Sequence, residues 1–262
     1  MHHVHQSLLY AHIATGLVAV IAFWLPVAAH KGSDWHIRAG RFYVWAMYAV
    51  TATAFSMCVL VLVNPVGIAA EGEYISAERA WSVRSNAQTF AVFLLMLSLL
   101  VLSALRHGLL ALRLKSDANV LKRPMHRALI IALGVVSVLV GWVGVDQGRI
   151  LLMVFAVLGI NGAIRMFRET LRSEWTRGEM VFAHLNGLLG TGIGAYTAVF
   201  AFGGSRLLAE LLPGQLQVIP WVTPAIVGTI VVARMKRRYV RKTTEPRRAG
   251  AVASIKAALT RA

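Results

Sequence analysis

The chain is poor in the residues that most enzymes use for chemistry. It has one cysteine, Cys58, which excludes an internal disulfide and a CxxCH haem-attachment motif. Cys58 falls inside an apolar run, so a buried thiol without a chemical role is expected. The sequence also contains no HExxH, Ser-His-Asp, Walker or CxxC pattern. No metal site is therefore indicated, and no residue is assigned a catalytic role.

Charged residues are scarce as well. They make up 15% of the 262 residues, against about 25% in a soluble domain. Apolar residues make up 57%, the mean hydropathy is +0.64, and apolar runs near the length of a membrane span recur along the chain. Because only helices satisfy their own backbone groups singly in lipid, the sequence predicts an all-α, polytopic membrane helical bundle.

Seven transmembrane helices are expected. The start, MHHVHQ, lacks the basic region of a cleavable signal peptide, so the first apolar run is taken as a retained span. We expect residues 1–235 to form a single helical-bundle domain and residues 236–262 a basic tail. The predicted spans are 7–29, 42–63, 87–112, 126–145, 150–167, 181–202 and 221–235.

The Lys and Arg residues predict the orientation of this bundle. Segments 30–41, 106–127, 165–179 and 234–262 hold 23 of the 27, and the intervening segments hold the other four. Basic residues concentrate on the cytoplasmic side of membrane proteins. The N-terminus is therefore predicted to lie outside and the C-terminus in the cytoplasm.

The net charge of +16 is thus mostly an orientation signal. The last segment, 234–262, carries ten basic residues and one acidic residue, Glu245. Such a cluster after a span is attracted to the anionic headgroups of membrane lipids. The tail has a single aromatic residue, Tyr239, and no nucleic-acid-binding motif, so nucleic acid is not an expected partner.

Small residues recur at helical spacing in the second, fourth and sixth predicted spans. Such stripes let the backbones of membrane helices approach closely. They place these three helices near the centre of the bundle, although the glycines of the sixth span could instead flank a solute path. The stripes of the fourth and sixth spans are Gly134, Ser137, Gly141 and Gly144, and Gly187, Gly190 and Gly194.

The nine histidines are the groups that suggest chemistry. An inner set at the predicted cytoplasmic ends of several helices could hold a b-type haem or a metal, since two neutral imidazoles on facing helices are a suitable axial pair. His12 lies near the outer end of the first span. Histidines at membrane edges also bond headgroups, water and helix ends. The cofactor-binding candidates are His12, His36, His107, His126 and His184.

Two groups of residues carry a resemblance to a known family. They are His12, Gly16, Lys31, Gly32, His36, Gly40, Arg41 and Met47 in the N-terminal part, and His184, Gly190, Gly192, Gly194, Tyr196, Phe202, Gly203, Pro220, Trp221, Pro224, Gly228 and Arg237-Arg238-Tyr239 in the C-terminal part. This pattern resembles the bacterial predicted membrane protein family catalogued as domain of unknown function twenty-three-oh-six. The match covers both ends and most of the chain, and residues 60–180 match loosely. The resemblance implies a multi-pass protein of the bacterial inner membrane and singles out His12, His36 and His184.

Three functions stay open at this point. The first is a haem-associated or redox membrane protein with the inner histidines as ligands. The second is a transporter-like bundle for a small solute or lipid, lined by Asn161, Asn186 and His184 beside the sixth span. The third is a membrane scaffold subunit without chemistry. No acidic residue lies in the middle of a predicted span, which argues against a transporter built on an intramembrane carboxylate.

Overall fold

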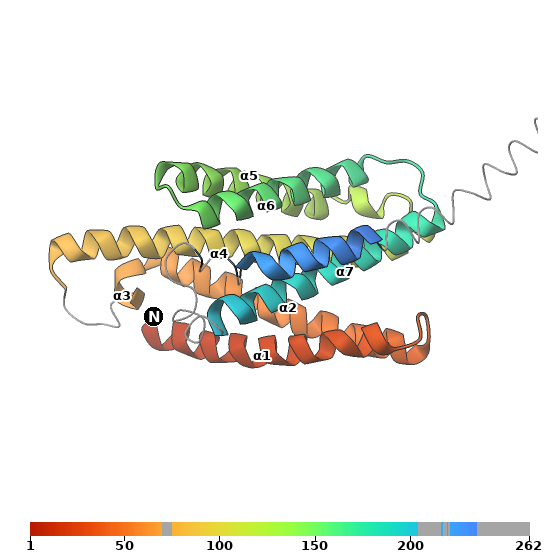
Figure 1. Cartoon of the computed structure of the whole chain (residues 1–262), viewed down its shortest axis with the longest axis horizontal. Helices are drawn as coiled ribbons and strands as arrows, with labels where there is room; N and C mark the ends of the chain where they lie inside the picture. Colours follow the sequence, from red (N-terminus) through yellow and green to blue (C-terminus); the bar gives the residue numbers. More distant parts are fainter. Residues whose placement is uncertain (70–74, 204–215, 217–218, 220, 235–262) are drawn as a thin grey trace, which may run out of the picture.

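The computed structural model describes residues 1–69, 75–203, 216, 219 and 221–234, and within them it contains helices and no strand (Figure 1). This confirms the all-α fold class. Six helices are long and apolar enough to cross a membrane, and a shorter apolar helix, Trp221–Arg234, follows them. The described helices are α1 (His2–Ala28), α2 (Asp34–Val63), α3 (Pro65–Ala69), α4 (Ala77–Ala111), η1 (Leu112–Lys115), η2 (Val120–Lys122), α5 (Pro124–Asp146), α6 (Ile150–Thr170), α7 (Arg177–Ala198) and the π-helix η3 (Val199–Gly203).

Several helices begin earlier than their apolar runs. α2 begins at Asp34 instead of residue 42, because Ser33 accepts a hydrogen bond from the His36 amide at 3.2 Å and caps the helix. α4 begins at Ala77 instead of residue 87, after the capping residue Ser76. The polar stretch after Gly32 is therefore mostly the first turns of α2, and the connection to α1 is a tight turn with Gly32 at a φ of +85°.

α4 is the central helix of the bundle, and it packs against α2, α5, α6 and α7 (Figure 1). The second, fourth and sixth spans were expected at the centre of the bundle. The structure instead places the third span, α4, at the centre, and the fourth span, α5, at one side of it. α5 instead pairs with α6 and lies along one side of α4. Small residues allow two helices to approach closely, but they do not specify which helix lies at the centre of the bundle.

The predicted small-residue contacts do occur between particular pairs of helices. Between α5 and α6, a Cβ on Gly141 would lie 3.2 Å from Ala156 Cβ. Between α4 and α7, a Cβ on Gly187 would lie 2.6 Å from the carbonyl oxygen of Ala104. The α4–α7 crossing therefore depends on the absence of a side chain at Gly187, whereas a Cβ at Gly141 would require only a small shift of its neighbour.

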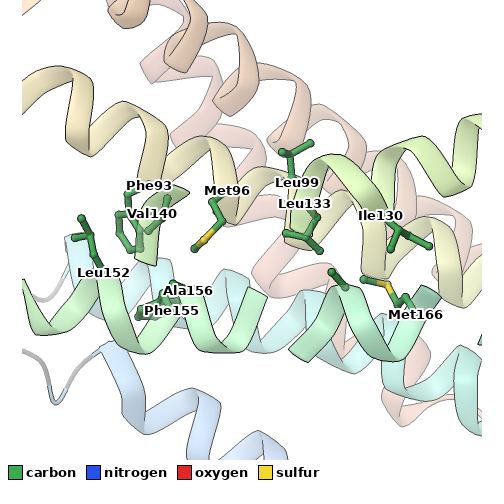
Figure 2. Close-up of a cluster of buried hydrophobic side chains, with 11 residues drawn as sticks. Phe93, Met96, Leu99, Ile130, Leu133, Val140, Leu152, Phe155, Ala156 and Met166 are labelled. Atoms are coloured by element: carbon green, nitrogen blue, oxygen red, sulfur yellow. The ribbon is translucent and has the colours of Figure 1, made fainter. Parts of the chain in front are cut away.

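The main apolar core lies between α4, α5 and α6 (Figure 2). Phe93 and Met96 from α4 contact the facing sides of α5 and α6, and Phe155 meets Phe93 edge-on with 5.5 Å between ring centroids. Trp221 adds a ring 5.7 Å from Phe93 and joins the last described helix to this core. The core fixes the relative positions of three helices that also carry polar side chains at one end.

The end of the bundle that holds the α1–α2, α4–α5 and α6–α7 connections is called the inner end here, after the predicted orientation (Figure 1). Positive-inside sorting supplies that orientation, which stays a prediction. The basic tail, residues 236–262, and with it the division of the chain at residue 235, lies outside the described residues.

Candidate functional site

Three titratable side chains from three helices form a hydrogen-bonded chain at the inner end. His107 of α4 lies between His126 of α5 and Glu169 of α6. His107 Nδ1 is 3.1 Å from His126 Nε2, and His107 Nε2 is 2.6 Å from Glu169 Oε2. Two of the five candidate histidines, His107 and His126, are thus brought into direct contact. We refer to these three residues as the His-His-Glu chain.

The members of the chain differ in their access to the surface. His126 is 0% and His107 is 1% exposed, whereas the side chain of Glu169 is 19% exposed. Glu169 is therefore the end of the chain that faces the surface, and His126 is the end inside the bundle. His126 Nδ1 has no hydrogen-bond partner among the described residues.

The directions of these hydrogen bonds follow from Glu169 Oε2, because an oxygen of an ionised carboxylate can only accept. An ionised Glu169 accepts from His107 Nε2–H, so a neutral His107 has a lone pair on Nδ1 and accepts from His126 Nε2–H. If His107 carries two protons, it donates to both neighbours and His126 holds its proton on Nδ1. A proton can thus pass along the chain with shifts within the existing hydrogen bonds, and neither ring has to rotate.

Arg165 and Asn186 support the carboxylate from the other side. Arg165 Nη1 donates to Glu169 Oε1 at 3.2 Å, one helical turn away on α6. With its amide oxygen turned toward the guanidinium, Asn186 of α7 accepts from Arg165 Nη1 and Nη2, both at 3.1 Å. Both oxygens of Glu169 are therefore engaged, and the network extends over α4, α5, α6 and α7.

A hollow of about 350 Å³ lies next to this network on α6. Its lining is unusually basic for a membrane helix, since it includes three arginines and one carboxylate. The lining residues are Asn161, Ile164, Arg165, Arg168, Glu169 and Arg172.

His36 and His184 lie at the same inner end but outside the chain. Each uses its Nδ1–H to reach a backbone carbonyl, that of Pro26 at 3.0 Å for His36 and that of Gly108 at 3.1 Å for His184.

The register of α2 and α7 places these two histidines at the same level of the bundle. Both helices begin at the inner end and run parallel, and Tyr43 of α2 bonds Thr191 of α7 at 2.7 Å. His36 and His184 each precede these partners by seven residues, or about two helical turns. They therefore occupy the same level on neighbouring helices.

His12 is separated from the other candidates. It lies on α1 toward the opposite end, where its Nδ1–H reaches Val50 O at 3.1 Å and Thr53 Oγ1 at 3.0 Å on α2. Its bonds join α1 to α2, so its observed contacts are structural.

The His107–His126 contact has the length of a hydrogen bond. Within the described part of the chain, no three His, Cys, Asp or Glu side chains are grouped as metal ligands.

Sequence reasoning missed Glu169 and its partner Arg165 as members of the site. Glu169 lies beyond the predicted span 150–167, but α6 continues to Thr170 and its last turn faces α4. The available signal was the Arg165–Glu169 spacing of four residues, which places both on one helical face. A comparison with family models, curated proteins and solved structures finds no match to this chain.

Proposed function

We propose that this multi-pass membrane protein is a transporter-like bundle in which the His-His-Glu chain takes up and releases a proton as a solute moves. The observation that carries the proposal is the continuous hydrogen bonding of His126, His107 and Glu169 from the interior to the surface. Ionisable groups buried between membrane helices are costly, and they commonly mark proton or ion pathways.

Glu169 can serve a proton relay although no acidic residue lies in the middle of a predicted span. Glu169 is not in the middle of a span, but its bond to His107 extends its reach to two fully buried imidazoles. The carboxylate also lines the hollow, so the chain reaches the surface of the described bundle. The chain thereby connects a surface site to the bundle interior.

Two polar residues expected to line a solute path lie beside this chain. Asn161 lines the hollow, and Asn186 bonds Arg165, which itself bonds Glu169. A solute in the hollow would contact the same groups that hold the proton-carrying carboxylate. This proximity is what proton-linked transport requires, since solute and proton must affect each other's binding.

A purely structural role for the chain makes a different prediction. A buried polar network that only holds helices together loses stability when one member is removed, because its partner is left without a hydrogen bond. His126→Leu should then lower the unfolding temperature and leave proton movement by the folded protein unchanged. We expect proton movement by the folded variant to be at least tenfold slower.

The test uses the full-length protein reconstituted in liposomes that contain the pH dye pyranine. The internal pH is followed after addition of anionic, cationic or neutral solutes, and after imposition of a pH gradient. We expect protein-dependent proton movement in the wild type and at least tenfold slower movement in Glu169→Gln and His126→Leu, as for loss of a proton-transfer group. His30→Leu is the matched control, because His30 is exposed at the same end. Wild-type liposomes that match protein-free liposomes under every condition would refute the proposal.

Haem binding is the second candidate function, and His36 and His184 are the pair that supports it. Each ring anchors Nδ1 on a backbone carbonyl and leaves Nε2 available, which is the usual arrangement of a metal-ligating imidazole. If haem binds, His36 and His184 would hold it, and the haem would supply electron transfer. A Soret band after expression with haem supply, lost in His36→Leu and His184→Leu, would establish it; no band in the wild type would eliminate it.

The membrane and the family are also part of the proposal. The resemblance carried by His36, His184 and the surrounding glycines supports a bacterial inner membrane protein of the family named above. The distribution of basic residues supports a cytoplasmic inner end.

A further inference from the structure

We infer that the hollow on α6 is a binding site for a phosphate-bearing anion. The site lies beside the His-His-Glu chain, but its occupation is an equilibrium property that does not require proton movement. The inference starts from four polar residues that line the hollow. Asn161, Arg165 and Arg168 follow one another on α6 at spacings of four and three residues, which place them on one face of the helix, and Arg172 lies just past the end of α6 in the connection to α7.

The three arginines that line the hollow differ in how far a neighbouring carboxylate already balances their charge. Arg165 donates to Glu169 at 3.2 Å, and Arg172 donates to Glu179 at 2.6 Å. Arg168 lies between them, is exposed, and forms no ion pair with any described residue. The hollow therefore contains one guanidinium whose charge is not matched by a carboxylate, with a second and third guanidinium close by.

A phosphate group fits this arrangement chemically. The planar guanidinium presents paired N–H donors that match two phosphate oxygens, and it loses less hydration on binding than an ammonium does. The volume of about 350 Å³ exceeds that of a simple ion and is within the range of sites for small organic ligands. A phosphate ester thus uses both the charge and the space.

Apolar side chains at the edge of the hollow indicate where the rest of the ligand lies. Ile164 of α6 lines the hollow and is 45% exposed, and Leu171, which directly follows α6, is 61% exposed. In a membrane-spanning helix, exposed apolar side chains of this kind face lipid. Basic pockets at the cytoplasmic side of membrane helices bind phospholipid headgroups in the same setting.

The two sources of a phosphate ester are a phospholipid headgroup and a soluble phosphate compound, and the experiment separates them. Full-length protein is purified in detergent, and binding of phosphatidylglycerol, phosphatidylcholine and glycerol phosphate is measured by native mass spectrometry and thermal shift. Phosphatidylglycerol binding alone identifies a headgroup. Glycerol phosphate binding alone identifies a soluble ligand, and binding of both shows recognition of the phosphate ester itself.

Arg168→Gln is the variant that tests the site. Loss of a charged hydrogen-bond donor should weaken binding of phosphatidylglycerol or glycerol phosphate about tenfold. Arg113→Gln is the matched control. Arg113 is exposed at the same inner end but outside the hollow, and its substitution removes the same charge. Arg168→Lys, which keeps the charge without the paired donors, should give an intermediate loss.

Two outcomes would overturn the inference. Binding that is unaffected by Arg168→Gln, or binding that falls equally in Arg168→Gln and Arg113→Gln, would show that the arginines attract anions only through general surface charge. Failure of the wild type to bind any of the three compounds would also refute it. Proton movement is measured separately on Glu169→Gln, so a failure here is distinct from a failure of the proposed transport function.

Discussion

The crossing of α4 and α7 gives a pair of glycine substitutions that should change stability in opposite directions. At Gly187, an added Cβ would lie 2.6 Å from Ala104 O and 2.8 Å from Gly108 Cα. These are backbone atoms of α4 and cannot rotate away. Carbon–oxygen contacts normally have separations of ~3.3–3.6 Å, so the two helices would have to separate by about 0.7–1 Å.

The cost of Gly187→Ala has two parts. Overpacking a tight contact costs about 1–3 kcal/mol. Separation of the helices also lengthens the 3.1 Å bond from His184 to Gly108 O, which contributes about 0.5–1.5 kcal/mol. The higher helix propensity of alanine returns up to about 1 kcal/mol. We expect a net destabilisation of about 0.5–4.5 kcal/mol.

Gly190→Ala is the matched control on the same helix. A Cβ at Gly190 would meet no atom within 4 Å, so only the propensity term applies. This variant should be as stable as the wild type or more stable by up to about 1 kcal/mol. Unfolding of each variant in the same detergent, followed by tryptophan fluorescence, provides the comparison. Equal stability of the two variants, or a less stable Gly190→Ala, would refute the assignment of this crossing to backbone contact.

Three further predictions concern other parts of the chain. Tyr43→Phe should destabilise the fold by about 0.5–1.5 kcal/mol, because it removes the buried bond to Thr191, whereas Tyr10→Phe at an exposed position should not; unfolding midpoints test both. Cys58 is 3% exposed, so maleimide should label it after unfolding and hardly at all in the folded protein. A reporter that is active only in the cytoplasm should be active when fused to the C-terminus, and a well-expressed, silent fusion would contradict the orientation.

Hydropathy identified the helices because lipid imposes a minimum length of apolar residues on each span. It placed several ends incorrectly because a capped helix continues into the polar interface, as α2 does from Ser33 and α7 does from the capping box of Thr176 and Glu179. The apolar run specifies where the membrane is, and the cap specifies where the helix begins.

The site was predicted in part for a related reason. The sequence grouped His107 and His126 at the inner end, since both flank the α4–α5 connection. It could not pair His107 with Glu169, because that contact depends on the rotation of α6 against α4 and joins two residues separated by 62 positions in the sequence. Central placement of α4 is likewise a property of all its neighbours together and leaves no signature in its own small residues.

The His-His-Glu chain also constrains the order in which the protein can be assembled. α4 enters the membrane before either partner of His107 has been synthesised, since His126 belongs to α5 and Glu169 to the end of α6. Until those helices arrive, α4 carries an imidazole into the bilayer without its native hydrogen bonds. The nascent helix must then remain at the insertion machinery, or keep its inner end at the membrane surface, until α6 is complete. Because the partners of the central helix are synthesised after it, stable insertion of the first half of the chain depends on synthesis of the second half.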